Sequence, residues 1–100
     1  MKRDEVLRTA TDLICKEREG DYGDSHTLHT NVGLAWTAIL RQRGLIRQAG
    51  AAIDAEAVLL CMAALKVVRE AGFHKDDNLI DAAGYVALVA ESANGVRSAR

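Results

Sequence analysis

The chain contains no proline, and its aromatic residues are limited to one Trp, one Phe and two Tyr among 100 residues. Proline is the strongest helix breaker, so its absence leaves long helices uninterrupted. Alanine, the best helix former, is by contrast abundant. The composition therefore predicts an all-α chain.

Neither sign of charge is in clear excess, because 13 basic residues stand against 14 acidic residues and the formal net charge is −1. A domain that binds nucleic acid usually carries a positive excess. We therefore do not expect nucleic acid as a partner, although Arg41, Arg43 and Arg47 keep a local basic patch open.

The apolar runs are too short to span a bilayer, and Met1–Glu5 lacks the apolar core of a signal peptide. We expect a soluble, cytoplasmic protein with no membrane partner. The two cysteines, Cys15 and Cys61, form no Cys-x-x-Cys pair, so zinc ribbons and redox motifs are unsupported. Both lie within helical patterns and are predicted to be buried free thiols.

Apolar residues recur at helical spacing in segments separated by glycines and polar residues. Ser25 and Asp54 are the expected N-caps of the second and third helices, and Asp76 or Asp77 that of the fourth. The second helix should end near Gly44. Residues 1–100 are thus predicted to form a single helical domain, with helices at about 4–18, 25–43, 54–71 and 77–93.

The last two predicted helices are apolar on almost every side. Ala57–Leu65 has no polar side chain, and Ala82–Ala90 has no charge. Such helices need burial on several sides, which a chain of 100 residues cannot easily provide. We therefore predict a four-helix bundle that is completed by homo-oligomerisation, as a homodimer or a higher oligomer. Gly84, inside the last helix, predicts close approach of another helix.

A dense polar segment, His74–Asp81, separates these apolar helices. Asp77 and Asp81 are four residues apart and share one helix face, where like charges repel unless a cation or a metal compensates. The pair could hold Mg²⁺, which is often bound by one or two carboxylates together with substrate phosphates. In the structural alternative, Asp77 is an N-cap and Asp81 pairs with Lys75 or Lys66.

Lys66 and Arg69 are three residues apart near the end of the third helix, and the following turn should bring them close to the aspartates. Cations beside a metal suit a phosphate-bearing ligand. Alternatively, they are ordinary basic residues at a helix C-terminus that form ion pairs. Tyr85 lies four residues beyond Asp81, so its hydroxyl either faces the site or is the polar end of a core ring.

A second polar group begins at Asp21–Asp24 and continues with His26 and His29. The two histidines share a helix face and could ligate a transition metal with Asp24. The other interpretations are a turn beside a core aromatic residue, or a pocket for a base or a sugar that is lined by Tyr22, His29, Asn31 or Trp36.

Four motifs occur together in this chain: Asp21-Tyr22-Gly23, Trp36, Lys66-x-x-Arg69 and Lys75-x-Asp77-x-x-x-Asp81-x-Ala83-Gly84-Tyr85. The combination resembles a family of small phage and prophage helical proteins of unknown function. That family distantly resembles the all-α nucleotide pyrophosphohydrolases of the MazG type. Those enzymes are helical oligomers that hold magnesium with Glu-x-x-Glu and Glu-x-x-Asp pairs. Here only Asp81 matches such a pair, with Asp77 as a substitute, and the Glu-x-x-Glu pair has no counterpart.

The resemblance implies a MazG-like protein that binds a nucleotide or another phosphate-bearing small molecule. If the protein is an enzyme, the resemblance implies that it hydrolyses nucleoside triphosphates in a Mg²⁺-dependent reaction. Asp77 and Asp81 would be the catalytic, metal-holding residues. The substrate-binding residues would be Lys66, Arg69, Lys75, Tyr22, Trp36 and Tyr85. The alternative is a non-enzymatic phage accessory protein whose apolar helices bind itself or a host partner. A phage origin would place the protein in the host cytoplasm.

Overall fold

The structure is a computed structural model that describes residues 1–17 and 25–96, with the side chains of 1–15 and 25–91. Over these residues the chain is all-helical, as predicted, with four α-helices, one π-helical turn and no strand. The predicted first helix is divided in two, because its last described turn is π-helical. The elements are α1 (Arg3–Asp12), η1 (Leu13–Glu17), α3 (Ser25–Gln42), α4 (Ala55–Gly72) and α5 (Asp76–Val96).

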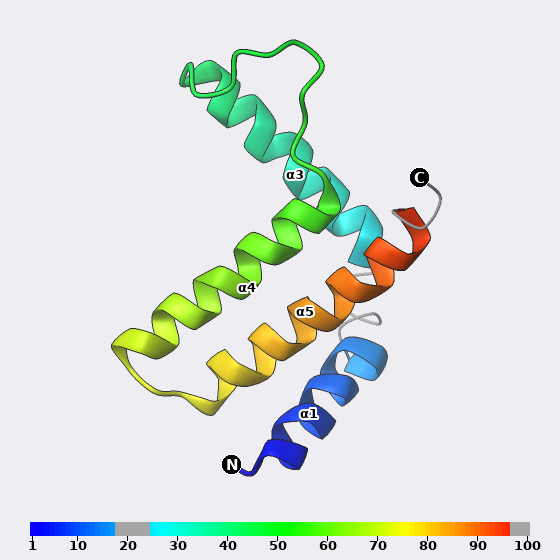
Figure 1. Cartoon of the computed structure of the whole chain (residues 1–100), viewed down its shortest axis with the longest axis vertical. Helices are drawn as coiled ribbons and strands as arrows, with labels where there is room; N and C mark the ends of the chain where they lie inside the picture. Colours follow the sequence, from blue (N-terminus) through cyan, green and yellow to red (C-terminus); the bar gives the residue numbers. More distant parts are fainter. Residues whose placement is uncertain (18–24, 97–100) are drawn as a thin grey trace.

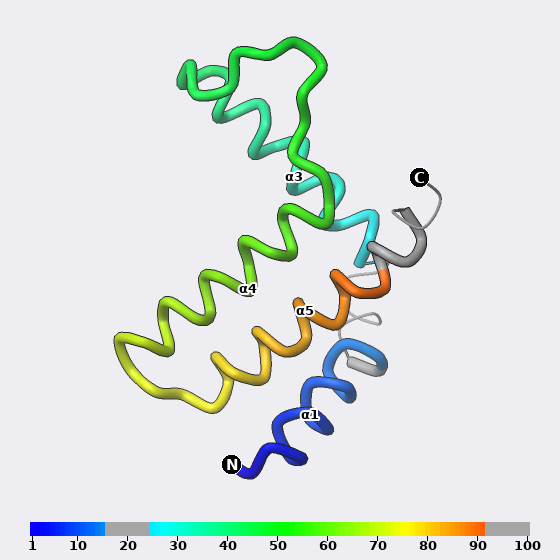
Figure 2. Tube along the Cα trace, in the orientation of Figure 1, coloured from blue at the N-terminus to red at the C-terminus, as the bar shows by residue number. Residues whose placement is uncertain are grey.

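The helices form an open arrangement. α4 and α5 are an antiparallel pair, α1 packs along the other side of α5, and α3 crosses the N-terminal end of α4 (Figure 1). The C-terminal part of α3 and the loop that follows it extend away from the other helices (Figure 2). The Cα radius of gyration is 15.0 Å, whereas a compact domain of this length has about 13 Å. One chain therefore does not close into a compact bundle.

The connection between α3 and α4 begins and ends as its local sequence predicts. Gly44 adopts a φ of +77°, and the N–H of Leu45 donates to the carbonyl of Leu40 at 2.9 Å. This is a glycine-terminated helix end of the Schellman type. Asp54 is confirmed as the N-cap of α4, because its Oδ1 accepts from the N–H of Ala57 at 2.8 Å.

The end of this connection, just before α4, is linked to α3 through the hydroxyl group of Thr37. Thr37 Oγ1 donates to the carbonyl of Gly33 at 2.7 Å and accepts from the N–H of Ile53 at 2.8 Å. A Cβ on Gly33 would lie 2.1 Å from the carbonyl oxygen of Ile53. Only glycine therefore allows the connection to approach this closely, a requirement that sequence reasoning missed.

The start of α5 differs from the prediction. Asp76 and Asp77 are not N-caps but lie inside the first turn, where negative side chains interact favourably with the helix dipole. Glu70, at the end of α4, ties the turn instead: its Oε1 accepts from the N–H of Lys75 at 3.0 Å, and its Oε2 bonds His74. The hydrogen bonds from His74 and the Lys75 amide lower the pKa of Glu70 below its usual 4.5.

The apolar core is small. Among the residues whose side chains are described, only Val58 has a large side chain that is fully buried, and the other buried apolar residues are Ala10, Ala55, Leu59, Ala63 and Ile80. On α4, four large apolar side chains remain exposed: Leu60, Leu65, Val67 and Val68. Cys15 and Cys61 are exposed as well, so the prediction of buried thiols is wrong. Periodicity could not place Cys61 because α4 is apolar on both sides.

Among the described residues, none of the helices combines the length and the apolar character needed to cross a bilayer.

Candidate ligand-binding site

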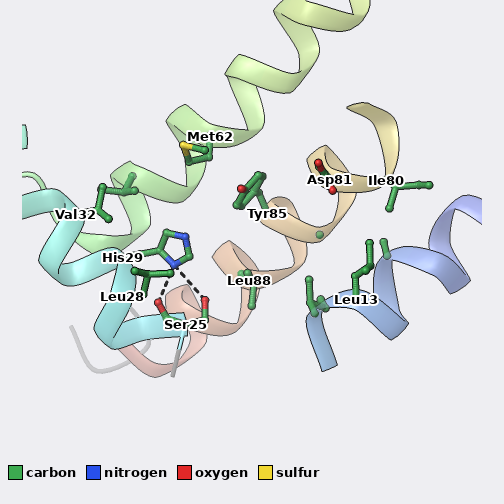
Figure 3. Close-up of a pocket in the computed structure, with 14 residues that line it drawn as sticks. Leu13, Ser25, Leu28, His29, Val32, Met62, Ile80, Asp81, Tyr85 and Leu88 are labelled. Atoms are coloured by element: carbon green, nitrogen blue, oxygen red, sulfur yellow. Dashed lines mark hydrogen bonds between the residues drawn. The ribbon is translucent and has the colours of Figure 1, made fainter. Parts of the chain in front are cut away.

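A cavity of about 340 Å³ lies where all four α-helices meet (Figure 3). Pockets that bind small ligands span about 300–1,000 Å³, so this one suits a small molecule. Most of its wall is apolar. Its lining residues are Ala10, Leu13 and Ile14 before α3, Ser25, Leu28, His29 and Val32 on α3, Val58 and Met62 on α4, and Ile80, Asp81, Gly84, Tyr85 and Leu88 on α5.

Helical spacing explains why one side of α5 forms the longest wall. Ile80, Gly84 and Leu88 lie four positions apart, as do Asp81 and Tyr85, so the lining residues share one face. Gly84 lies in the middle of that face, and a Cβ there would be 3.0 Å from Ile14 Cγ2. The predicted close approach at Gly84 is therefore confirmed, and the approaching segment is η1.

An ion pair joins α4 to α5 beside the cavity. Lys66 Nζ lies 3.1 Å from Asp81 Oδ2, with only 17% and 14% of the two side chains exposed. Asp81 also lines the cavity. Of the two partners expected for Asp81 in the structural alternative, this pair confirms Lys66. The turn between the last two helices thus brings one predicted cation and one predicted carboxylate together.

Tyr85 lies in the same wall, as the hypothesis of a shared site required. Its ring meets that of His29 edge to face, with centroids 6.2 Å apart and planes at 87° (Figure 3). His29 Nδ1 lies 2.7 Å from the carbonyl oxygen of Ser25 and 3.2 Å from its Oγ. A carbonyl oxygen can only accept, so Nδ1 carries the proton. In the neutral ring, Nε2 is then the acceptor.

The other predicted site residues are not brought to this cavity. Asp77 is exposed in the first turn of α5 and does not line it. Arg69 and Lys75 line a separate hollow of about 240 Å³ at the turn between α4 and α5. Trp36 is half-buried on α3 and borders neither hollow. Tyr22 lies outside the described residues.

The described side chains offer no complete set of ligands for a metal ion. Within residues 1–15 and 25–91, no three His, Cys, Asp or Glu side chains are close enough together to hold one. Magnesium at Asp81 would have to compete with the ammonium group of Lys66, which already neutralises this carboxylate. His29 offers only one free ring nitrogen, since Nδ1 bonds Ser25, and Asp24 lies outside the described residues. The residues present therefore fit a metal poorly.

Sequence reasoning missed most of the cavity wall. It named His29 as a pocket residue, but grouped it with Asn31, which is exposed, and not with Tyr85. One local signal was available, because Ser25 and His29 lie four residues apart and share a helix face. The pairing of α3 with α5 across the cavity depends on tertiary packing that no local signal reveals.

Residues 5–93 match a family that is described as a domain of unknown function, DUF6378. The Gene 55 protein of Mycobacterium phage L5 is 33% identical over 86 residues, which are 84% of this chain and 49% of that protein. The chain therefore spans about half the length of this relative. No solved structure gives a significant match. These findings support a helical family of unknown function with a phage member, and they do not show the resemblance to MazG-type enzymes.

Proposed function

The chain belongs to the DUF6378 family of domains of unknown function, and we propose that it is a non-enzymatic phage accessory protein that assembles with copies of itself. The observation that carries this proposal is the exposed area. The chain exposes 7091 Å², whereas a compact monomer of 10.8 kDa exposes about 5,500 Å². A chain with this much excess surface is stabilised by covering part of it.

The outer face of α4 is the surface best suited to that contact. It is defined here by Leu60, Leu65, Val67 and Val68, all of them between 46% and 70% exposed. The smaller residues on the same side of the helix are Cys61, Ala64, Ala71 and Gly72, so this face carries no charge. A second copy packed on it would complete the four-helix bundle that one chain leaves open.

The excess of exposed surface area over that of a compact monomer is large enough for a stable homodimer interface. If each copy covered its excess area, the interface would bury roughly 3,000 Å² in total, within the range of about 2,000–5,000 Å² for obligate homodimers. A weak, transient complex would bury a much smaller area. The apolar character of the face also agrees with obligate interfaces, which resemble a domain core that has been cut in half.

Sedimentation velocity at micromolar concentration tests the proposal. We expect a species of at least twice the 10.8 kDa chain mass. Leu65→Glu, which places a charge on the outer face of α4, should shift the protein towards the monomer. Leu7→Glu is the matched control, because Leu7 is an exposed leucine on α1. A monomer at every concentration would overturn the proposal.

A second candidate function is the MazG-like binding of a nucleotide, and one observation favours it. Lys66 and Asp81, which the nucleotide hypothesis assigns to phosphate and metal binding, meet beside a cavity that Tyr85 lines. Here Tyr85 would contact the base, while Lys66 and Arg69 would contact phosphates.

Two assays separate this candidate from the first proposal. Under nucleotide binding, a nucleoside triphosphate with Mg²⁺ raises the melting temperature, since a ligand that binds only the folded state stabilises it. Hydrolysis would additionally release pyrophosphate. The absence of any thermal shift with the common triphosphates, with or without Mg²⁺, would remove this candidate and leave self-association unaffected.

A further inference from the structure

The cavity among the four α-helices presents few polar groups, and the carboxylate in its described lining is paired with a cation. Asp81 is the one acidic side chain in the described lining, and its carboxylate lies 3.1 Å from the ammonium of Lys66. A ligand therefore needs no net charge to fill the cavity. Phosphate inside it would lie against the Asp81 carboxylate and would lose its hydration to an apolar wall.

His29 provides an acceptor that the protein itself does not use. Its Nδ1 donates to the Ser25 carbonyl at 2.7 Å, which fixes the neutral tautomer. Among the described residues, Nε2 has no hydrogen-bond partner. Figure 3 shows the ring between Ser25 on one side and Tyr85 on the other. The free nitrogen therefore offers a lone pair to an N–H or O–H group in the cavity.

The surrounding walls suit a flat ring. The rings of His29 and Tyr85 are nearly perpendicular, at 87°, so a planar molecule that stacks on one of them meets the edge of the other. Met62 adds a thioether, which adapts to irregular shapes and packs well on aromatic rings. An apolar cavity of about 150 Å³ binds benzene, so a cavity of about 340 Å³ accommodates two fused rings.

We propose that this cavity binds a small, neutral, flat heteroaromatic molecule of one or two fused rings, whose N–H group donates to His29 Nε2. The apolar walls supply most of the affinity, and the hydrogen bond fixes the orientation of the ring. This site depends neither on self-association nor on the phosphate contacts of the nucleotide candidate.

Indole and 1-methylindole are matched probes, because the methyl group removes the N–H donor and leaves the ring system unchanged. Isothermal titration of the full chain should show indole binding about threefold to tenfold more tightly, the range of one hydrogen bond. His29→Phe should abolish this preference, since phenylalanine keeps a ring but has no acceptor. His26→Phe is the control, because His26 is exposed on the same helix and lies outside the lining.

A measurement on the unaltered chain keeps the test decisive if His29→Phe fails to fold. In a long-range ¹H–¹⁵N spectrum of the histidine rings, indole should shift the Nε2 resonance of His29, and 1-methylindole should not. Equal affinity for the two probes, or binding of neither, would overturn the proposal. Binding of adenosine triphosphate with Mg²⁺ but not of indole would also overturn it, in favour of the nucleotide candidate.

Discussion

Asp81 on α5 lies 3.1 Å from Lys66 on α4, and both side chains are more than four-fifths shielded from solvent. The pair joins the two helices at the edge of the cavity. We expect Asp81→Asn to lower the free energy of unfolding by about 1–3 kcal/mol, between the values for exposed and fully buried pairs. The reason is that the Lys66 ammonium would remain shielded without its counter-charge. Urea denaturation measures this change.

A double-mutant cycle isolates the interaction between these two side chains. Lys66→Met removes the cation and keeps an unbranched side chain, so the combination with Asp81→Asn removes both charges of this pair. We expect the double variant to be more stable than the sum of the two single changes implies. If the two losses simply add, the contact between Lys66 and Asp81 contributes nothing to stability.

Thr37→Val removes the hydroxyl that links α3 to the connection before α4. The N–H of Ile53 then loses its partner, and an unsatisfied buried donor costs about 1–3 kcal/mol. Thr11→Val is the matched control: Thr11 Oγ1 also donates to the carbonyl four residues earlier, at 2.9 Å, but it is exposed. The control should change stability by less than about 0.5 kcal/mol. Equal losses in both variants would show that the hydroxyl of Thr37 does not hold the connection.

Gly33→Ala places a methyl group where no space exists. The Cβ would lie 2.1 Å from the carbonyl oxygen of Ile53, so the backbone must move. We expect a loss of about 1–3 kcal/mol, the usual range for overpacking. Gly72→Ala is the control, since nothing lies within 4 Å of its added Cβ, and alanine in a helix is favoured over glycine by about 0.5–1 kcal/mol. Thermal unfolding followed by circular dichroism compares the two variants.

The elements of this fold could be predicted because their signals are local. Gly44 and Asp54 act on their own neighbouring backbone groups, and the structure confirms both. The buried face of α4 could not be predicted, because apolar residues occupy most of the helix surface. Their spacing then does not indicate which side of the helix faces the core. The exposed Cys61 is the direct consequence. Neighbouring helices, and not the pattern of α4 itself, decide which side is covered.

The candidate site could also be predicted only in part. A short turn places Lys66 opposite Asp81, so sequence separation alone was a reliable guide to that contact. Asp77 shares a helix face with Asp81 but lies one turn, about 5.4 Å, nearer the end of the helix. Because of this one-turn offset, Asp81 lines the cavity whereas Asp77 faces solvent. The contact of His29 with Tyr85 joins α3 to α5 and required the tertiary structure.

The turn between α4 and α5 should make stability depend on pH. The hydrogen bond to Glu70 raises the pKa of His74 above its usual 6.5, with a further contribution from the charge of Glu70 and a smaller one from Asp76. The same hydrogen bond lowers the pKa of Glu70 below 4.5. A raised histidine pKa contributes stability that is complete below pH 6.5 and is lost as the pH rises through the higher pKa of the folded state.

A lowered carboxyl pKa acts in the opposite direction. The contribution of Glu70 is present above pH 4.5 and is lost as the pH falls through the lower pKa of the folded state. Between pH 4.5 and pH 6.5, the contributions of His74 and Glu70 to stability are both present. Melting temperatures of the unaltered chain and of His74→Gln should therefore differ most at about pH 5–6 and converge at high pH. His26→Gln, which changes an exposed histidine outside this turn, is the control. A difference that grows as the pH rises from neutral would contradict the stabilising role of protonated His74.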